Sequence, residues 1–297
     1  MFEERSVRGL VAIVTDSTAS LPGVSAAAEL AEPCLSLVAI VPLRLLAGGL
    51  VADDGTAEAA AVEDAAARGA RLTTARPPPG RFAAAYQAAA DAGARSVVSV
   101  HLPETMSGTI VSAELAAAMS PVPVRVVDAR TIGTGLGVTV LEAARLAGTG
   151  LGHDEIAAGA TRYAQRVGSF FALADPDVLL AGGRVPAAPP EPALARSRLV
   201  SRPILRVRCG RIEQVERVRT MAAAVDRLAE LAAGYANGEA VDVAIEHTAA
   251  AGRAADLGDR LAGIPRLGRR YLIASGTAIL AHAGRGMLGV TVAPARG

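Results

Sequence analysis

Strand-like runs alternate with alanine-rich helical segments through the first half of this 297-residue chain, and no other feature of the sequence constrains its fold as strongly. Strands that alternate with helices form a parallel sheet with helices on both faces. Ligands bind such a sheet at the carboxyl ends of its strands. The expected strands are residues 11–16, 37–45, 96–102 and 124–128, and the expected helices include residues 81–92, 107–119 and 136–147.

The second half of the chain follows a different pattern. Residues 203–218 read as two strands joined by a glycine turn, so part of this sheet is expected to be antiparallel. We therefore predict an α/β protein with a parallel domain in residues 1–150 and a mixed-sheet domain in residues 151–297. The expected strands here are 169–174, 203–208, 211–218, 241–247, 269–274 and 287–293, with helices at 221–235 and 251–262.

The charge and composition exclude several classes of function. The formal net charge is +1, whereas nucleic-acid-binding proteins usually carry a basic face. All 30 basic residues are arginine, so a P-loop lysine and Schiff-base chemistry are excluded. The two cysteines, Cys34 and Cys209, lie far apart and are too few for a disulfide framework or a zinc site.

No segment of the sequence predicts stable insertion in a membrane. The N-terminus, MFEERSVRG, has no signal-peptide core behind it. The most apolar stretch near it, residues 35–52, contains Pro42 and Arg44 and reads as a strand followed by a turn. We expect a cytoplasmic protein.

Polar side chains follow the strands at the edge where a ligand is expected. Asp16, Ser17 and Thr18 come directly after the first strand, and Ser107, Gly108 and Thr109 follow the third. A helix is expected to begin near Ser107, where free backbone N–H groups and the helix dipole favour an anion. The alternative is that Ser107 only caps its own helix.

Three further motifs have both a structural and a functional interpretation. Thr74 precedes three prolines that fix an extended chain, either to hold its hydroxyl in place or simply to lead into a helix. His282 is expected between a strand and a glycine-rich turn, although a lone histidine is more often structural than catalytic. Arg184 follows two glycines, which present it at a turn. The glycines of DARTIGTGLGV do not fit a dinucleotide fingerprint and indicate close packing instead.

The motifs VAIVTDSTASLP, TTARPPPGRF, MSGTIVSAEL, LLAGGRV and LAHAGRGMLGVTVAP occur in an order and spacing that resemble the DegV family. These are bacterial fatty-acid-binding proteins that serve as the lipid-carrying subunit of fatty acid kinase. The resemblance covers roughly residues 9–294. It implies a four-stranded parallel sheet followed by a six-stranded mixed sheet, with one long-chain fatty acid buried between helices and sheet.

The resemblance also implies roles for single residues. The fatty acid carboxylate would be held by Thr74 and Ser107, with Gly108 and Thr109 in the same motif and His282 near the head group. Arg184 would dock the catalytic subunit of the kinase, which supplies the phosphate and the metal, so the chain itself would need no cofactor and would not be an enzyme. The turn Asp16-Ser17-Thr18 is expected to brace the donor loops as a second layer.

The sequence departs from the family pattern at two arginines. Arg76 stands where the family has Gln, and Arg285 stands where it has Pro. We hypothesise that one of these guanidinium groups strengthens the anion site. The departures leave open a divergent member that binds another small amphipathic anion or lacks a kinase partner.

Two enzymatic alternatives compete with the lipid-carrier interpretation. In the first, Ser107 is a nucleophile and His282 its base in hydrolysis of an acyl ester, but no GxSxG elbow is present. In the second, the chain binds a nucleotide, but it has no phosphate-binding loop. The length and saturation of the preferred acyl chain cannot be predicted from the pattern.

Overall fold

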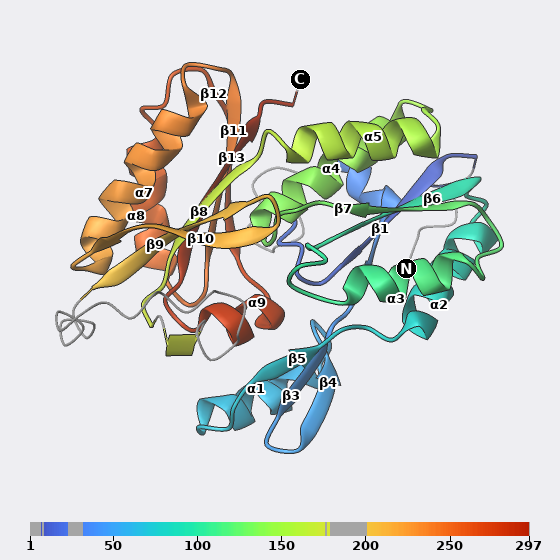
Figure 1. Cartoon of the computed structure of the whole chain (residues 1–297), viewed down its shortest axis with the longest axis horizontal. Coiled ribbons are helices and arrows are strands. Elements are labelled where there is room, and N and C mark those ends of the chain that lie inside the picture. Colours follow the sequence, from blue (N-terminus) through green and yellow to red (C-terminus); the bar gives the residue numbers. More distant parts are fainter. Residues whose placement is uncertain (1–6, 8, 23–31, 176, 179–200, 297) are drawn as a thin grey trace.

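The structure is a computed structural model that describes residue 7 and residues 9–22, 32–175, 177–178 and 201–296. Two large sheets lie side by side, and a small third sheet stands below them (Figure 1). The predicted α/β fold, with a four-stranded parallel sheet followed by a six-stranded mixed sheet, is confirmed.

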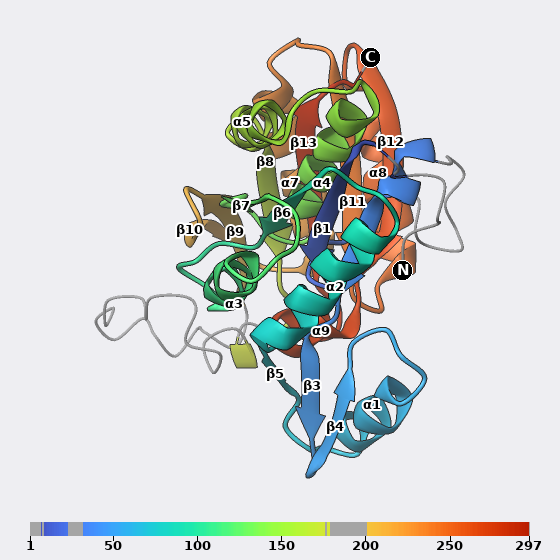
Figure 2. The same cartoon turned by 90° about the vertical axis from the view of Figure 1, so that its right-hand side faces the viewer.

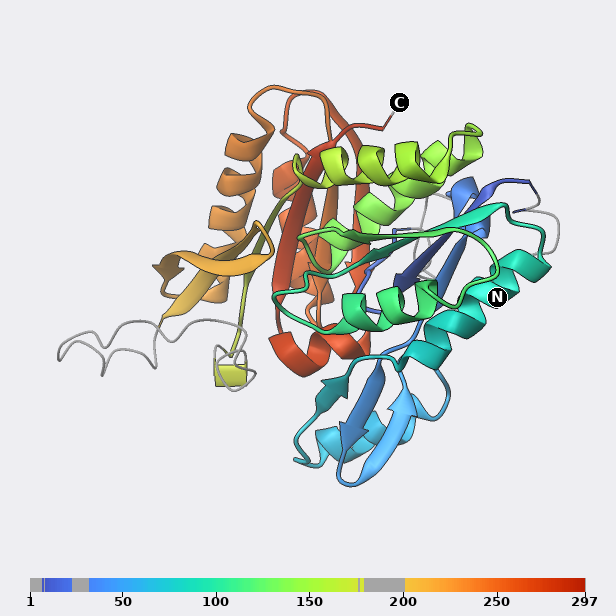
Figure 3. The same ribbon diagram turned by 45° about the vertical axis from the view of Figure 1, so that its right-hand side comes forward.

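The first sheet has the strand order β2-β1-β6-β7, and all of its pairs are parallel. The central strands β1 and β6 are buried along their whole length, as expected where helices cover both faces. Helices α2 and α3 pack on one face and α4 and α5 on the other (Figure 3). The elements are β1 (Val11–Asp16), β2 (Val38–Val41), β6 (Ser96–His101), β7 (Val124–Asp128), the 3-10 helix η1 (Pro33–Leu37), α2 (Pro79–Asp91), α3 (Thr109–Ala117), α4 (Thr134–Gly148) and α5 (His153–Ala164).

The second sheet has the order β10-β9-β8-β13-β11-β12, with β11 and β12 parallel and the other pairs antiparallel. The predicted hairpin is present, and it turns at Cys209 and Gly210, which both have positive φ. Helices α7 and α8 cover one face, and α4 packs on the other. The elements are β8 (Gly168–Ala172), β9 (Arg202–Arg208), β10 (Arg211–Val218), β11 (Val241–His247), β12 (Leu267–Ala274), β13 (Leu288–Pro294), α7 (Met221–Ala236) and α8 (Ala251–Leu261).

The small sheet was not predicted, and the single strand expected over residues 37–45 is wrong. Pro42 separates β2 from β3, because proline has no N–H to continue a ladder. The small sheet projects from the rest of the molecule and contacts it at α9 (Figure 2). Ala278 of α9 lies in the hydrophobic core of the small sheet. Its elements are β3 (Arg44–Ala47), β4 (Leu50–Asp53), β5 (Thr73–Ala75) and α1 (Ala59–Ala67), and α9 spans Thr277–Ala283.

One carboxylate between the two large sheets joins their loops. Glu246, at the end of β11, accepts hydrogen bonds from Ser20 Oγ at 2.5 Å and from the backbone N–H of Thr134 at 2.9 Å. Ser275 Oγ donates a third bond at 2.9 Å. Gly133 has φ +58°, and a β-carbon there would overlap this carboxylate. The site therefore requires glycine.

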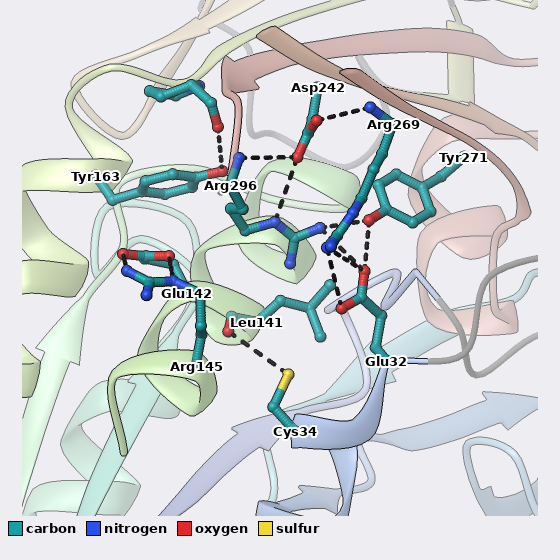
Figure 4. Close-up of polar contacts among 11 residues, drawn as sticks. Glu32, Cys34, Leu141, Glu142, Arg145, Tyr163, Asp242, Arg269, Tyr271 and Arg296 are labelled. Atoms are coloured by element: carbon teal, nitrogen blue, oxygen red, sulfur yellow. Dashed lines mark hydrogen bonds and ion pairs between the residues drawn. The ribbon is translucent and has the colours of Figure 1, made fainter. Parts of the chain in front are cut away.

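A second carboxylate links the sheets at their opposite ends (Figure 4). Glu32 precedes η1 and accepts hydrogen bonds from Tyr271 OH at 2.5 Å and from Arg296 Nη2 at 3.3 Å. Arg269 Nη1 lies 3.3 Å from the same carboxylate. The Arg296 side chain is 2% exposed, and its Nε lies 3.5 Å from Asp242. Glu32 is thus held by residues that come from the last part of the chain.

Candidate functional site

A cavity of about 100 Å³ lies where the first sheet, the second sheet and the small sheet meet. Four of its lining residues also line a second cavity of about 50 Å³, so the two are neighbours. The residues common to both are Ile132, Phe171, Ile279 and Ala283. The first cavity is further lined by the apolar Leu43, Leu102, Met106 and Ile212 and by the polar Thr18, Thr74, Arg76, Ser107 and His282.

Thr74 and His282, more than 200 residues apart in the sequence, meet at this cavity. Thr74 Oγ1 lies 2.7 Å from His282 Nε2, and the tautomer of the histidine decides which group donates. Thr74 is on β5, where its register partner is Leu45 of β3. His282 lies in the last turn of α9, so the predicted position between a strand and a turn is wrong. The helix ends at Gly284, whose φ is +70°.

Ser107 lines the cavity from the loop before α3. Its hydroxyl lies 2.8 Å from Thr109 Oγ1 and accepts a hydrogen bond of 3.3 Å from the N–H of Thr109. Thr109 is buried and does not line the cavity. Gly108, between them, lies under the Arg76 guanidinium, because a β-carbon on it would overlap Arg76 Nη1. The N-cap of α3 is Gly108, and Ser107 reaches the start of the helix only through its bond to the N–H of Thr109.

The three arginines predicted from the sequence have different positions. Arg76 is exposed at the mouth of the cavity and lines it. Arg285 is exposed in the turn after α9 and does not line the cavity. Arg184 lies outside the described residues.

The turn after β1 supports the cavity from behind. Thr18 lines the cavity, and both its N–H and its hydroxyl bond to Asp16 Oδ1, at 3.0 and 2.5 Å. Ser17 Oγ accepts the N–H of Leu43 at 3.1 Å and also bonds to Asp54. Burial raises the pKa of Asp54, and hydrogen bonds from Ser17 and from the first turn of α9 lower it. The turn thus connects β1 to the helix that carries His282.

His101 is a buried residue of the site region that the sequence analysis missed. Its Nδ1 lies 2.8 Å from Asp16 Oδ2, and both side chains are fully buried. His101 is the last residue of β6, and parallel β1 is its neighbour in the sheet. The available signal was its place at the carboxyl end of a central strand, where polar residues gather.

A larger groove, of about 1090 Å³, lies elsewhere in the described part of the chain. It runs between β7, α5, β8 and β9, and charged surface residues such as Arg130, Asp154 and Arg208 line it. Among the described residues no group of three or more His, Cys, Asp or Glu is placed to hold a metal ion. Nor does any described helix have the length and apolar character needed to cross a bilayer.

The chain is similar to known proteins along nearly its whole length. A family model described as uncharacterised protein, DegV family, matches residues 10–295. A DegV domain-containing protein of Streptomyces coelicolor is 40% identical over 284 residues, which cover 95% of this chain and 98% of that protein. One from Mycobacterium tuberculosis is 36% identical over 287 residues, which cover 95% and 96%.

The fold is also similar to that of solved structures. A DegV family protein from Thermus thermophilus, described for its fatty acid binding, superposes with a TM-score of 0.83 at 28% identity, covering 96% of this chain and 100% of that one. DegV family protein Cg2579 from Corynebacterium glutamicum gives a TM-score of 0.78 at 26% identity, covering 97% and 98%. This chain therefore belongs to the DegV family.

Proposed function

We propose that this protein binds a long-chain fatty acid in the two neighbouring cavities and holds its carboxylate with Thr74, Ser107 and His282. The observation that carries the proposal is that both polar and apolar side chains line the first cavity. Hydroxyl, imidazole and guanidinium groups line it beside Ile132, Phe171, Ile212 and Ile279. The Thermus thermophilus family member described for fatty acid binding supports the same ligand class.

The physical requirements of this ligand match the residues. Each buried methylene contributes about 0.8 kcal/mol, so an acyl chain of a dozen carbons contributes roughly 10 kcal/mol before ordering costs. A carboxylate taken from water needs several donors. The Ser107 hydroxyl and the hydrogen-bonded pair of Thr74 and His282 carry groups that can donate, and the exposed Arg76 guanidinium adds positive charge to the lining.

The cavities are too small for a long acyl chain as they stand. At about 100 and 50 Å³ they are smaller than the roughly 300–1,000 Å³ of ordinary ligand pockets. Side chains where the two cavities meet, above all Phe171 and Ile279, therefore have to move when the chain enters. Ligand entry is expected to change the surroundings of α9, which carries Ile279.

We further propose that the bound fatty acid is presented to a separate fatty acid kinase, so that the chain itself is not an enzyme. The geometry at Ser107 supports a binding role over ester hydrolysis. Among the described residues the Ser107 hydroxyl bonds only to Thr109, while His282 Nε2 meets Thr74. Arg184 is proposed to dock the kinase.

Native mass spectrometry of the purified protein tests the proposal. We expect a bound mass of roughly 250–300 Da that is lost on denaturation and is identified as a fatty acid. Ser107→Ala should carry less of it. Ser120→Ala changes a serine in the turn after α3 that does not line the cavity, and this variant should carry as much as wild type. Protein that is empty and ignores added fatty acids would refute the proposal. Failure of a fatty acid kinase to phosphorylate the bound acid would refute the proposed kinase partner and leave the proposed fatty acid binding intact.

A further inference from the structure

A continuous line of buried hydrogen bonds runs from Tyr86 of α2 to the cavity. Tyr86 OH donates to Ser99 Oγ at 2.9 Å, and Ser99 Oγ lies 2.7 Å from His101 Nε2. His101 Nδ1 meets Asp16 Oδ2 at 2.8 Å, and Thr18 donates to Asp16 Oδ1. The first four residues are fully buried and Thr18 is 4% exposed. Only Thr18 lines the cavity.

Counting protons along this line fixes the direction of the Thr18 hydroxyl. An ionised carboxylate only accepts, so Thr18 and His101 must both donate to Asp16. With its single proton committed to Asp16, Thr18 Oγ1 presents only lone pairs to the cavity. A ligand carboxylate also presents only lone pairs, so the two groups repel each other while Asp16 is charged.

One additional proton removes this conflict. A neutral Asp16 would donate from Oδ1 to Thr18 Oγ1, and the Thr18 hydroxyl would turn to donate to the ligand. His101 Nδ1–H would still donate to Oδ2. The proton also removes a negative charge that would otherwise lie, buried, close to the carboxylate of the ligand.

We propose that Asp16 and His101 form a proton-accepting pair that positions Thr18, so that binding of a carboxylate at the cavity takes up one proton. This inference rests on the proposed function. The groups that face the pair are Phe82 and Tyr86 from α2, with the Phe82 ring 5.0 Å from the His101 ring, and Ser99 on β6. On β7, Asp128 is the register partner of His101 and accepts the N–H of Arg130. Across the cavity the charged or titratable groups are Arg76 and His282.

Calorimetric titration with myristate, in buffers of different ionisation enthalpy, measures the proton count directly. We expect wild type to take up close to one proton near neutral pH, and its affinity to fall by up to about tenfold per pH unit as pH rises. Asp16→Asn should bind with no uptake and more tightly than wild type at pH 8. The variant lacks the buried negative charge near the ligand carboxylate, and its amide oxygen can still accept the backbone N–H of Thr18.

Three variants make the result specific. Thr18→Val should also lose the uptake, and it serves if Asp16→Asn does not fold. Thr139→Val removes a buried hydroxyl bonded to Gly135 O, away from the cavity, and should keep the uptake. His282→Gln should bind more weakly with the uptake intact. Binding without uptake, or uptake that survives in Asp16→Asn, would overturn this inference alone. No binding of myristate by wild type would overturn the proposed function and this inference with it.

Discussion

Arg76 and Arg285 are both departures from the family pattern, but they differ in their position relative to the cavity. Both guanidinium groups are exposed, but only Arg76 lines the cavity and covers Gly108. An exposed charge near a bound carboxylate acts through a screened field, so its effect is modest and depends on salt. The hypothesis that either arginine strengthens the anion site is thereby narrowed to Arg76.

Replacing these arginines separately tests the narrowed hypothesis. Arg76→Gln should weaken myristate binding about three- to tenfold at low salt, and the difference should shrink as salt rises. Arg285→Gln is the matched control and should bind as wild type does. Equal losses in the two variants would show that net charge, rather than position, matters. Titration calorimetry at two salt concentrations makes the measurement.

Helices and strands were predictable to the extent that their patterns were local. Apolar runs identified the strands of both large sheets, and the glycine turn identified the hairpin of β9 and β10. The small sheet is not predicted, because residues 37–45 read as one apolar run across Pro42 and because β4 and β5 have only four and three residues. His282 was misplaced because α9 has only seven residues, too few to show helical periodicity.

Site residues were predictable from the sequence only where a single local motif marks them. The hydroxyls of Thr74 and Ser107 stand next to rigid or helix-starting segments, which is visible in the sequence. The contact of His101 with Asp16 depends on the neighbouring positions of β6 and β1, and single-sequence patterns do not contain strand order. Phe171 and Ile279 became lining residues through packing between sheets, which periodicity does not resolve.

The loop that starts α4 gives a test at the scale of one element. Gly133→Ala should lower the free energy of unfolding by at least about 2 kcal/mol, because its φ of +58° is strained for alanine and the methyl group displaces Glu246. Gly234→Ala, exposed in the last turn of α7 with no atom near the new methyl group, should stabilise by up to about 0.5–1 kcal/mol. Urea unfolding followed by circular dichroism distinguishes the two. Similar stabilities of the two variants would contradict the role assigned to Gly133.

At the scale of the whole molecule, the cluster around Glu32 joins the first sheet to the end of the chain (Figure 4). Buried charges are stable only while their partners remain, since an unpaired buried charge costs several kcal/mol. Arg296 contacts Glu32, Tyr271 and Asp242 at once. Loss of Arg296 should therefore destabilise the packing around Glu32, beside the first sheet, and around Asp242, in the second sheet.

Arg296→Met is expected to destabilise the protein by about 3 kcal/mol, because it leaves Glu32 and Asp242 without their buried cation. Arg166→Met breaks an exposed pair with Glu239 and should change stability by less than about 1 kcal/mol. Urea unfolding of the full chain measures both. If the two variants were equally stable, the Glu32 cluster would contribute no more than a surface pair.

Helix α4 packs against both large sheets, with Leu136 and Val140 in the core of the first and Val138 against the second. Many small-molecule carriers open like a clamshell, with two lobes that rotate about a flexible strap. A helix that packs in two cores opposes such a rotation. Turning one sheet against the other would expose apolar side chains of α4 that are now buried in one of the two cores. The two large sheets are therefore expected to move as one rigid body, because α4 belongs to the cores of both. Entry and release of the proposed fatty acid would then require local movement of side chains around α9, with the two large sheets fixed relative to each other.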